Sequence, residues 1–269
     1  MGYKLIALDI DGTIRNADHP ISNRTRDTLN KVIEVGAMVT VATGRMFQSA
    51  VKTTSGLNLR SPIASFQGAH IADPLTGKVL WHMPLTASMT VEALEALEQW
   101  GLETMAYYEH EVYVDKKSER VESYGIRNEV GVHIVDDLKV LADKLFTRLV
   151  VVGGEPEIKE VESQMQTQFG TRLHITRSLP YFCEILHPSS GKHKALEWMC
   201  NYLGIEQQET IAIGNGYNDV HMLDWAGLGV AIGGAVEEVL DVSDMVTGPI
   251  EEDGVATLLE SLLTRGLIG

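Results

Sequence analysis

The sequence predicts an α/β protein in which a doubly wound parallel sheet forms the core and a second, α+β domain is inserted into it. Short apolar segments alternate with amphipathic helical ones in residues 1–82 and again in residues 188–269. This alternation is typical of a parallel sheet with helices on both faces. Residues 83–187 instead combine helices with amphipathic strands, which indicates a sheet with one covered face. We therefore expect a discontinuous Rossmann-like core and an inserted cap-like domain.

The first half of the predicted core reads as strand, helix, strand, helix, strand. Residues 4–10 are almost wholly apolar, as expected of a strand buried on both faces. Ser22 is a suitable N-cap for a helix that Gly36 would end. The remaining predicted elements of this half are a strand over 37–42, a helix over 46–55 and a strand over 62–66.

The second half of the core shows the same alternation, which again places helices on both faces of one parallel sheet. Its predicted elements are a helix over 192–203, a strand over 210–213, a helix over 219–225, a strand over 228–232, a helical turn over 236–240, a strand over 245–247 and a helix over 254–263. The elements predicted for the inserted domain are helices over 87–100, 117–130 and 155–169, and strands over 111–114, 147–152, 172–176 and 181–186.

Composition limits the classes of partner. Of the 269 residues, 44% are apolar and 22% are charged, which is typical of a globular protein. The 37 acidic and 22 basic residues give a net charge of -15. Nucleic acids and anionic membranes both require a positive surface, so neither is expected as a partner. An anionic substrate requires local positive groups or a metal ion at the site.

The sequence also bears on the cellular compartment. Cys183 and Cys200 are expected to be reduced thiols rather than a disulfide. The segment from Met1 to Lys4 leads directly into the first strand and has no secretory pattern. No apolar run reaches the roughly 20 residues that span a bilayer. We expect a cytoplasmic protein, and the sequence indicates no obligate protein partner.

The strongest chemical signal is the run from Asp9 to Thr13, DIDGT, at the end of the first strand. Carboxylates two residues apart on a strand point to the same face, and strand ends are where open parallel sheets bind ligands. Two clustered carboxylates repel each other unless a cation lies between them, and Mg²⁺ suits such a site. One Asp can then attack as nucleophile while the other transfers protons. The alternative is an acidic turn at the end of a strand.

Three further segments carry candidate residues. Thr43-Gly44-Arg45 follows the second strand and opens a helix, which favours anion binding, although a plain loop is the alternative. Lys192 begins a helix, where a cation is unfavourable unless it faces an anion. A solvated surface lysine is the alternative, and Lys194 competes for the role. The run GNGYND, residues 214–219, offers Asn and Asp oxygens to a metal or phosphate, or forms a plain turn.

These four motifs together resemble those of the haloacid dehalogenase (HAD) superfamily, specifically its Cof-like phosphatases, which have a large α/β cap. DIDGT matches the family's D-x-D-G-T, ATGR its second motif, SGKHKAL its K-G-x-A-L, and GNGYND its G-D-x-x-N-D. SFQGAHI and EEDGVATLL are similar to the family's N-G-A-x-I and E-D-G-V-A. The resemblance spans the whole chain and is most specific over the core. It selects Lys192 over Lys194.

The resemblance implies a role for each matching residue. Asp9 would be the nucleophile, and Asp11 the acid and base whose backbone carbonyl also binds Mg²⁺. Asn215 would complete the metal ligands, and Asp219 would hydrogen-bond behind them. The residues that the resemblance implies for the transferring phosphoryl group are the Ile10 backbone, Thr43, Gly44, Lys192 and Asn218. Mg²⁺ is the implied cofactor.

The sequence departs from the family pattern at three positions: Asn215 replaces Asp, Gln67 replaces Asn, and His193 replaces Gly. The function implied is a Mg²⁺-dependent phosphomonoesterase that acts on a small phosphorylated metabolite, with a sugar phosphate as first expectation, through an aspartyl-phosphate. The cap would close over the core to exclude water and select the substrate. The alternatives are a phosphomutase or phosphotransferase of the same superfamily, or a phospholigand-binding protein in which Asn215 has impaired turnover.

Overall fold

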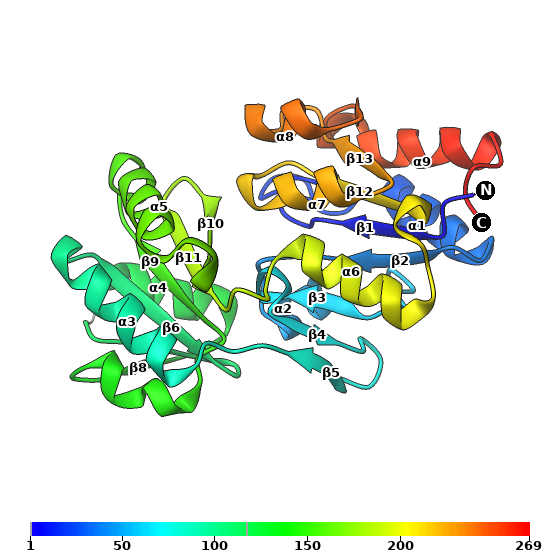
Figure 1. Cartoon of the computed structure of the whole chain (residues 1–269). Coiled ribbons are helices and arrows are strands. Elements are labelled where there is room, and N and C mark those ends of the chain that lie inside the picture. Colours follow the sequence, from blue (N-terminus) through cyan, green and yellow to red (C-terminus); the bar gives the residue numbers. More distant parts are fainter. Residues whose placement is uncertain (1, 117) are drawn as a thin grey trace. The chain divides into compact units, whose positions relative to one another are not determined.

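In the computed structural model, which describes residues 2–116 and 118–269, a five-stranded parallel sheet forms the centre of one unit of the chain (Figure 1). Its strands, in spatial order, are β14 (Met245–Val246), β13 (Leu228–Ala231), β12 (Thr210–Gly214), β1 (Leu5–Leu8) and β2 (Met38–Val41). The chain proceeds from β1 to β2 in one direction and from β12 to β14 in the other. The strand order therefore reverses between β1 and β12, which is where open α/β sheets bind ligands.

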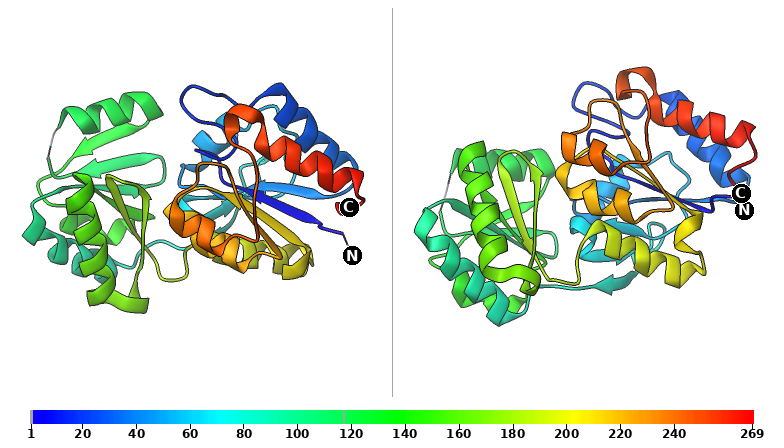
Figure 2. Two further views of the ribbon diagram at one scale, coloured as in Figure 1. Left: turned by 90° about the horizontal axis from the view of Figure 1, so that it is seen from above. Right: turned by 45° about the horizontal axis from the view of Figure 1, so that its top comes forward.

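Helices cover both faces of this sheet, so the predicted doubly wound core is confirmed. One face packs against α1 (Asn23–Glu34), α2 (Phe47–Thr53) and α9 (Gly254–Thr264), and the other against α6 (Lys192–Leu203), α7 (Val220–Trp225) and α8 (Glu237–Val242). Figure 2 shows α1 and α9 side by side. All four residues of β1 are fully buried, which explains why this strand is apolar at every position.

The helix α1 begins as its sequence predicts. The Ser22 hydroxyl accepts a hydrogen bond from the Thr25 N–H at 3.0 Å, and the chain leaves the helix at Gly36 with φ of 100°. The helix α6 has the predicted bounds of Lys192–Leu203. The caps and the apolar stripes that fix these helices are local, so the sequence alone was sufficient to place them.

The third predicted strand is present and lies beside β2, but its regular pairing is with the strand that follows it, which the sequence did not predict. β3 (Ile63–Ser65) lies in a separate sheet with β4 (His70–Ala72) and β5 (Val79–His82), and its pairing with β4 is antiparallel. A parallel bridge joins Ala64 to Ala42, the residue after β2, and the Thr43 N–H donates to the Ala64 carbonyl at 3.0 Å. The tight turn 66–68 folds the chain back onto β3, so that β4 pairs with it as well.

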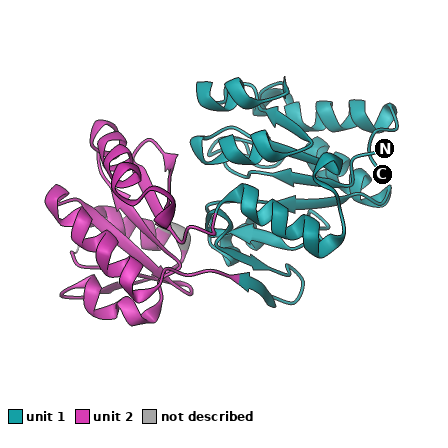
Figure 3. Ribbon diagram, viewed as in Figure 1, with its two compact units in different colours: residues 1–81, 191–269 teal, residues 82–190 magenta. Residues whose placement is uncertain are grey.

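The second unit comprises residues 82–190, and residues 1–81 with 191–269 form the first (Figure 3). The second unit contains a six-stranded sheet with the order β10 (His174–Leu179), β11 (Phe182–Leu186), β9 (Arg148–Val152), β6 (Glu103–Tyr108), β7 (Glu111–Val114) and β8 (Gly131–Ile134). The sheet is mixed, because β8 runs parallel to β7 and the other neighbours are antiparallel.

Helices α3 (Ala87–Leu97) and α5 (Glu155–Phe169) pack on one face of this second sheet. The helix α4 covers Glu119–Asn128, and Lys117, where its predicted range begins, lies outside the described residues. Cys183 in β11 and Cys200 in α6 are both buried free thiols. Within the described residues, no helix has the length and hydropathy needed to cross a membrane.

Candidate active site

A buried cluster of charges lies at the carboxyl ends of the core strands. Asp9 follows β1, Lys192 is the first residue of α6, and Asp219 precedes α7. The Lys192 Nζ donates to Asp9 Oδ1 and to Asp219 Oδ1, both at 2.6 Å. The three side chains are only 8%, 1% and 1% exposed for Asp9, Lys192 and Asp219. Charges are buried at this depth only when they are paired, and one ammonium between two carboxylates leaves the cluster net negative.

Burial sets the electrostatic state of this cluster. Desolvation raises the pKa of Asp9 to about 7, although Lys192 opposes the shift, and the nearby charges of Asp219 and Asp11 add to it. Burial alone would lower the pKa of Lys192, but Asp219 and Asp9 outweigh it and raise that pKa above its ordinary value. Lys192 is therefore a permanent cation. An additional positive charge next to Asp9 would stabilise its ionised form.

The second oxygen of Asp219 shapes the loop that follows β12. Asp219 Oδ2 accepts hydrogen bonds from the backbone N–H groups of Asn215 and Gly216, both at 2.9 Å. This turn places the Asn215 side chain, whose Oδ1 accepts a hydrogen bond from the Thr13 hydroxyl at 3.0 Å. Gly12 has φ of 91°, and a Cβ there would collide with the Asn215 amide. Asn215 thus lies against the turn that directly follows Asp11.

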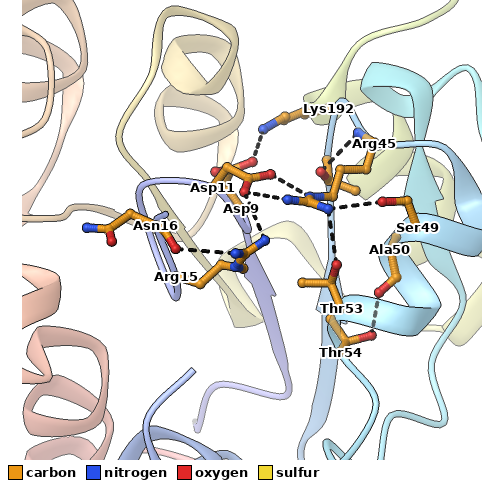
Figure 4. A network of polar contacts seen from close by, with 11 residues as sticks. Asp9, Asp11, Arg15, Asn16, Arg45, Ser49, Ala50, Thr53, Thr54 and Lys192 are labelled. Carbon is orange, nitrogen blue, oxygen red and sulfur yellow. Dashed lines mark hydrogen bonds and ion pairs between the residues drawn. The ribbon is translucent and has the colours of Figure 1, made fainter. Parts of the chain in front are cut away.

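Asp11 has a different environment from Asp9, although only Ile10 separates them. Its side chain is 51% exposed and forms a two-pronged contact with Arg45, with Nε to Oδ2 at 2.6 Å and Nη2 to Oδ1 at 2.7 Å (Figure 4). Arg45 Nη1 also donates to the hydroxyls of Ser49 and Thr53 on α2. A guanidinium held at both ends fixes the direction of the carboxylate. Arg45 therefore orients Asp11.

The residues predicted to bind phosphate lie in the loops after β1, β2 and β12 and at the start of α6. Thr43 is almost fully buried, and its hydroxyl accepts a hydrogen bond from the Arg45 N–H at 3.1 Å. The helix α2 begins at Phe47, later than predicted, and has only seven residues, so the expected helix-end charge at Gly44 is weak. The Ile10 carbonyl accepts from the N–H groups of residues 13, 14 and 15 and closes the turn of the first motif.

Lys192 and Lys194, which the residues alone left as competitors, differ in burial. Lys192 is buried and paired with Asp9, whereas Lys194 is partly exposed. His193 stands between them, and its ring centroid lies 5.4 Å from that of His221. Burial, and then His221 and Lys194, lower the pKa of His193 to about 4. His193 is therefore neutral near pH 7 and adds no charge beside Lys192.

Comparisons with known proteins identify the family. The sequence matches the model of the haloacid dehalogenase-like hydrolases over residues 6–259. The chain belongs to this family. It is 28% identical to the 5-amino-6-(5-phospho-D-ribitylamino)uracil phosphatase YitU of Bacillus subtilis (strain 168), over 95% of this chain and 96% of that protein.

Solved structures of haloacid dehalogenase-like proteins agree over both units. A hydrolase of this type from Bacteroides thetaiotaomicron has a TM-score of 0.81 and 29% identity, covering 97% of this chain and 99% of the other. A sugar phosphatase from subclass IIB of the superfamily has a TM-score of 0.82 and 26% identity, covering 98% and 100%. The predicted resemblance to Cof-like haloacid dehalogenase phosphatases is confirmed, and the chain is an enzyme of this hydrolase type.

Two residues of this haloacid dehalogenase-type site were not found by sequence reasoning. Arg45 stands in the ATGR motif but was given no role of its own, and Gln67 was noted only as a departure from the family pattern. Gln67 Oε1 accepts a hydrogen bond from Asn218 Nδ2 at 2.9 Å. Each of the two residues lies in a family motif, Arg45 in ATGR and Gln67 in SFQGAHI. Their place in these motifs is the sequence signal that marks them as candidate partners of the site residues.

Proposed function

We propose that this haloacid dehalogenase-type enzyme is a Mg²⁺-dependent phosphomonoesterase that hydrolyses a small phosphorylated metabolite through an aspartyl-phosphate on Asp9. The main support is the buried Lys192, whose ammonium contacts Asp9 and Asp219 at 2.6 Å. The phosphoryl group and the nucleophilic carboxylate are both negative and therefore repel each other. A fixed cation beside the carboxylate reduces this repulsion and favours the approach of the phosphoryl group.

In the proposed reaction Asp9 attacks phosphorus with Oδ2. Oδ1 already accepts from Lys192, whereas no hydrogen bond to Oδ2 occurs within residues 2–116 and 118–269. The bond from phosphorus to the leaving oxygen breaks as Asp11 donates a proton to that oxygen. Asp11 then takes a proton from the water that attacks the aspartyl-phosphate, which releases inorganic phosphate and restores Asp9. Both Asp11 oxygens accept from Arg45 in the structure, so Asp11 must release one of these two contacts to carry the proton, while the other keeps the carboxyl group oriented.

The phosphoryl oxygens are proposed to bind a set of donors from three loops and from the start of one helix. Lys192 provides an ammonium, Thr43 a hydroxyl and Asn218 an amide N–H, while the Ile10 and Gly44 backbones provide N–H groups. These residues come from the carboxyl ends of β1, β2 and β12 and from the start of α6. Because parallel strands bring their carboxyl ends to one edge, donors from distant parts of the sequence converge there.

The proposed metal ligands fit Mg²⁺ by their chemistry. The Asp9 carboxylate, the Asp11 carbonyl and the Asn215 amide offer only oxygen, as hard cations require. The Thr13 hydrogen bond to Asn215 Oδ1 holds this amide against the turn after Asp11. Mg²⁺, when bound, would offset the negative charge of Asp9 and of the phosphoryl oxygens. Among the described residues, no three His, Cys, Asp or Glu side chains gather as a metal site.

The substrate is proposed to be a sugar phosphate or a related polyol phosphate. One structural neighbour is a sugar phosphatase, and one relative is a phosphatase of a phosphoribityl compound. We also propose that the unit 1–81 with 191–269 is the catalytic core, and that the unit 82–190 is the cap domain, which selects the substrate.

The experiment is a screen of phosphate esters for release of inorganic phosphate, with Mg²⁺ and with a chelator. We expect Mg²⁺-dependent hydrolysis of p-nitrophenyl phosphate and preferred hydrolysis of sugar phosphates, with both abolished by Asp9→Asn. Hydrolysis that persists in Asp9→Asn would contradict the proposed nucleophile. Because Asn215 lacks a charge, a binding protein without turnover is the second candidate. Binding of phosphate esters with no hydrolysis at any Mg²⁺ concentration would establish that candidate instead.

A further inference from the structure

The turn between β3 and β4 has an unusual backbone. Phe66, Gln67 and Gly68 have φ of 49°, 55° and 83°, so three consecutive residues are left-handed. Only the last is a glycine, and residues with a Cβ adopt this conformation at a cost in free energy. Such a conformation persists only where its surroundings hold it, and it is found most often at functional sites.

The backbone of this turn holds the loop that follows β2. The Phe66 N–H donates to the Arg45 carbonyl and the Gln67 N–H donates to the Thr43 carbonyl, both at 2.9 Å. Thr43 and Arg45 flank Gly44 in the proposed phosphate loop. The left-handed conformation is what points two successive N–H groups at this loop.

Gly68 places the same turn against the start of α6. Its φ of 83° favours glycine, and a Cβ there would collide with the carbonyl oxygen of Gly191, the residue before Lys192. The turn therefore contacts the segment that carries the proposed phosphate-binding lysine.

The Gln67 side chain reaches a third loop. It is 1% exposed, and its Oε1 accepts a hydrogen bond from Asn218 Nδ2 at 2.9 Å. An amide nitrogen carries two hydrogens. When Gln67 accepts one of them, the orientation of the Asn218 amide is fixed, and its second N–H is available to a ligand.

We propose that Gln67 is a positioning residue of the phosphate site, which orients the Asn218 amide while its backbone holds the Thr43 loop. The inference rests on the proposed function, because it requires that Asn218 binds the phosphoryl group. Gln67 touches neither phosphorus nor its oxygens and acts only through Asn218 and the Thr43 loop. Gln67 is a departure of this sequence. The family pattern has Asn at this position.

The test is the binding of inorganic phosphate, measured by calorimetry in the presence of Mg²⁺. Gln67→Met retains the length of the side chain and removes the amide, and Gln67→Gly removes the side chain while tolerating the left-handed backbone. We expect each to weaken phosphate binding about three- to ten-fold, as loss of one neutral hydrogen bond implies. In an Asn218→Ala background, Gln67→Met should cause no further loss.

A matched control separates positioning from general destabilisation. Gly36 is also left-handed, with φ of 100°, but a Cβ there would meet nothing within 4 Å. Gly36→Ala should lower the melting temperature and leave phosphate binding unchanged. If both Gln67 variants bind phosphate as the wild type does while Asn218→Ala binds it more weakly, the positioning role of Gln67 is overturned and the proposed phosphate role of Asn218 stands. Unchanged binding in Asn218→Ala would overturn the phosphate role of Asn218 together with the inference. Additive losses from Gln67→Met and Asn218→Ala would show that Gln67 does not act through Asn218, and would also overturn it.

Discussion

Replacement of Lys192 by Met tests the buried charge cluster. The variant leaves the Asp9 and Asp219 carboxylates, 8% and 1% exposed, without their shared ammonium. Removing one partner of a buried ion pair costs about 3–5 kcal/mol of unfolding free energy. For a protein of this size, that loss lowers the melting temperature by roughly 10 °C. Turnover should fall with it, because the proposed phosphoryl site loses its fixed cation.

The stability lost in Lys192→Met should depend on pH in a definite direction. Burial already raises the pKa of Asp9 from 3.8 to about 7, and loss of Lys192 removes the largest influence that lowers it. In the variant, the folded-state pKa of Asp9 is therefore well above the unfolded one, and protonation favours the folded state. The variant should regain stability as the solution is acidified from about pH 8 to about pH 5, relative to the wild type.

The assay is urea unfolding at both pH values, with Lys194→Met as the matched control. Lys194 is partly exposed and lies two residues along the same helix, so its loss should change the unfolding free energy by less than about 0.5 kcal/mol. Equal stability of Lys192→Met and the wild type at the higher pH would refute the reasoning. A deficit that does not shrink on acidification would show that the lost stability is not that of unpaired carboxylates.

Three further predictions concern individual residues. Asn215→Asp should lower the Mg²⁺ concentration needed for half-maximal activity, because a carboxylate attracts the metal by charge as well as by coordination, and turnover at saturating Mg²⁺ should change little. Equal half-saturating Mg²⁺ concentrations in the variant and the wild type would exclude position 215 as a ligand. Arg45→Lys keeps the charge but loses the two-pronged contact with Asp11, so turnover should fall most for esters with poor leaving groups. The pKa of His193 is lowered to about 4 in the folded protein. The neutral ring therefore contributes stability above about pH 6.5, and this contribution is lost as the pH falls toward 4. Over this pH range the melting temperature of His193→Gln should fall less than that of the wild type.

The core elements were predictable because their signals are local. The strand β1 is buried on both faces and therefore apolar throughout, and α1 carries its own cap at Ser22. The strand β8 (Gly131–Ile134) was missed because its residues are mostly exposed and form no apolar run. The antiparallel pairing of β3 with β4 was not predicted, because it follows from the left-handed turn at Phe66–Gly68 and no propensity scale predicts positive φ at Phe or Gln.

The site was predictable by residue type and not by contact. Motif spacing placed Asp9, Asp11 and Asn215 at strand ends, but the residues alone did not separate Lys192 from Lys194. Burial separates them, and burial is a property of the packed fold. Likewise, the hydrogen bond from Arg45 to Asp11 joins residues that are 34 positions apart in the sequence. These residues meet because β1 and β2 lie side by side in the folded sheet.

The central claim is that Asp9 becomes phosphorylated. The most direct measurement is mass spectrometry of the protein after acid quench during hydrolysis of p-nitrophenyl phosphate with Mg²⁺, followed by digestion and fragmentation of the peptide that contains Asp9. We predict one added phosphoryl group on Asp9 in the wild type and none in Asp9→Asn. Turnover with no phosphoryl group on Asp9, or with the group on another residue, would contradict the account.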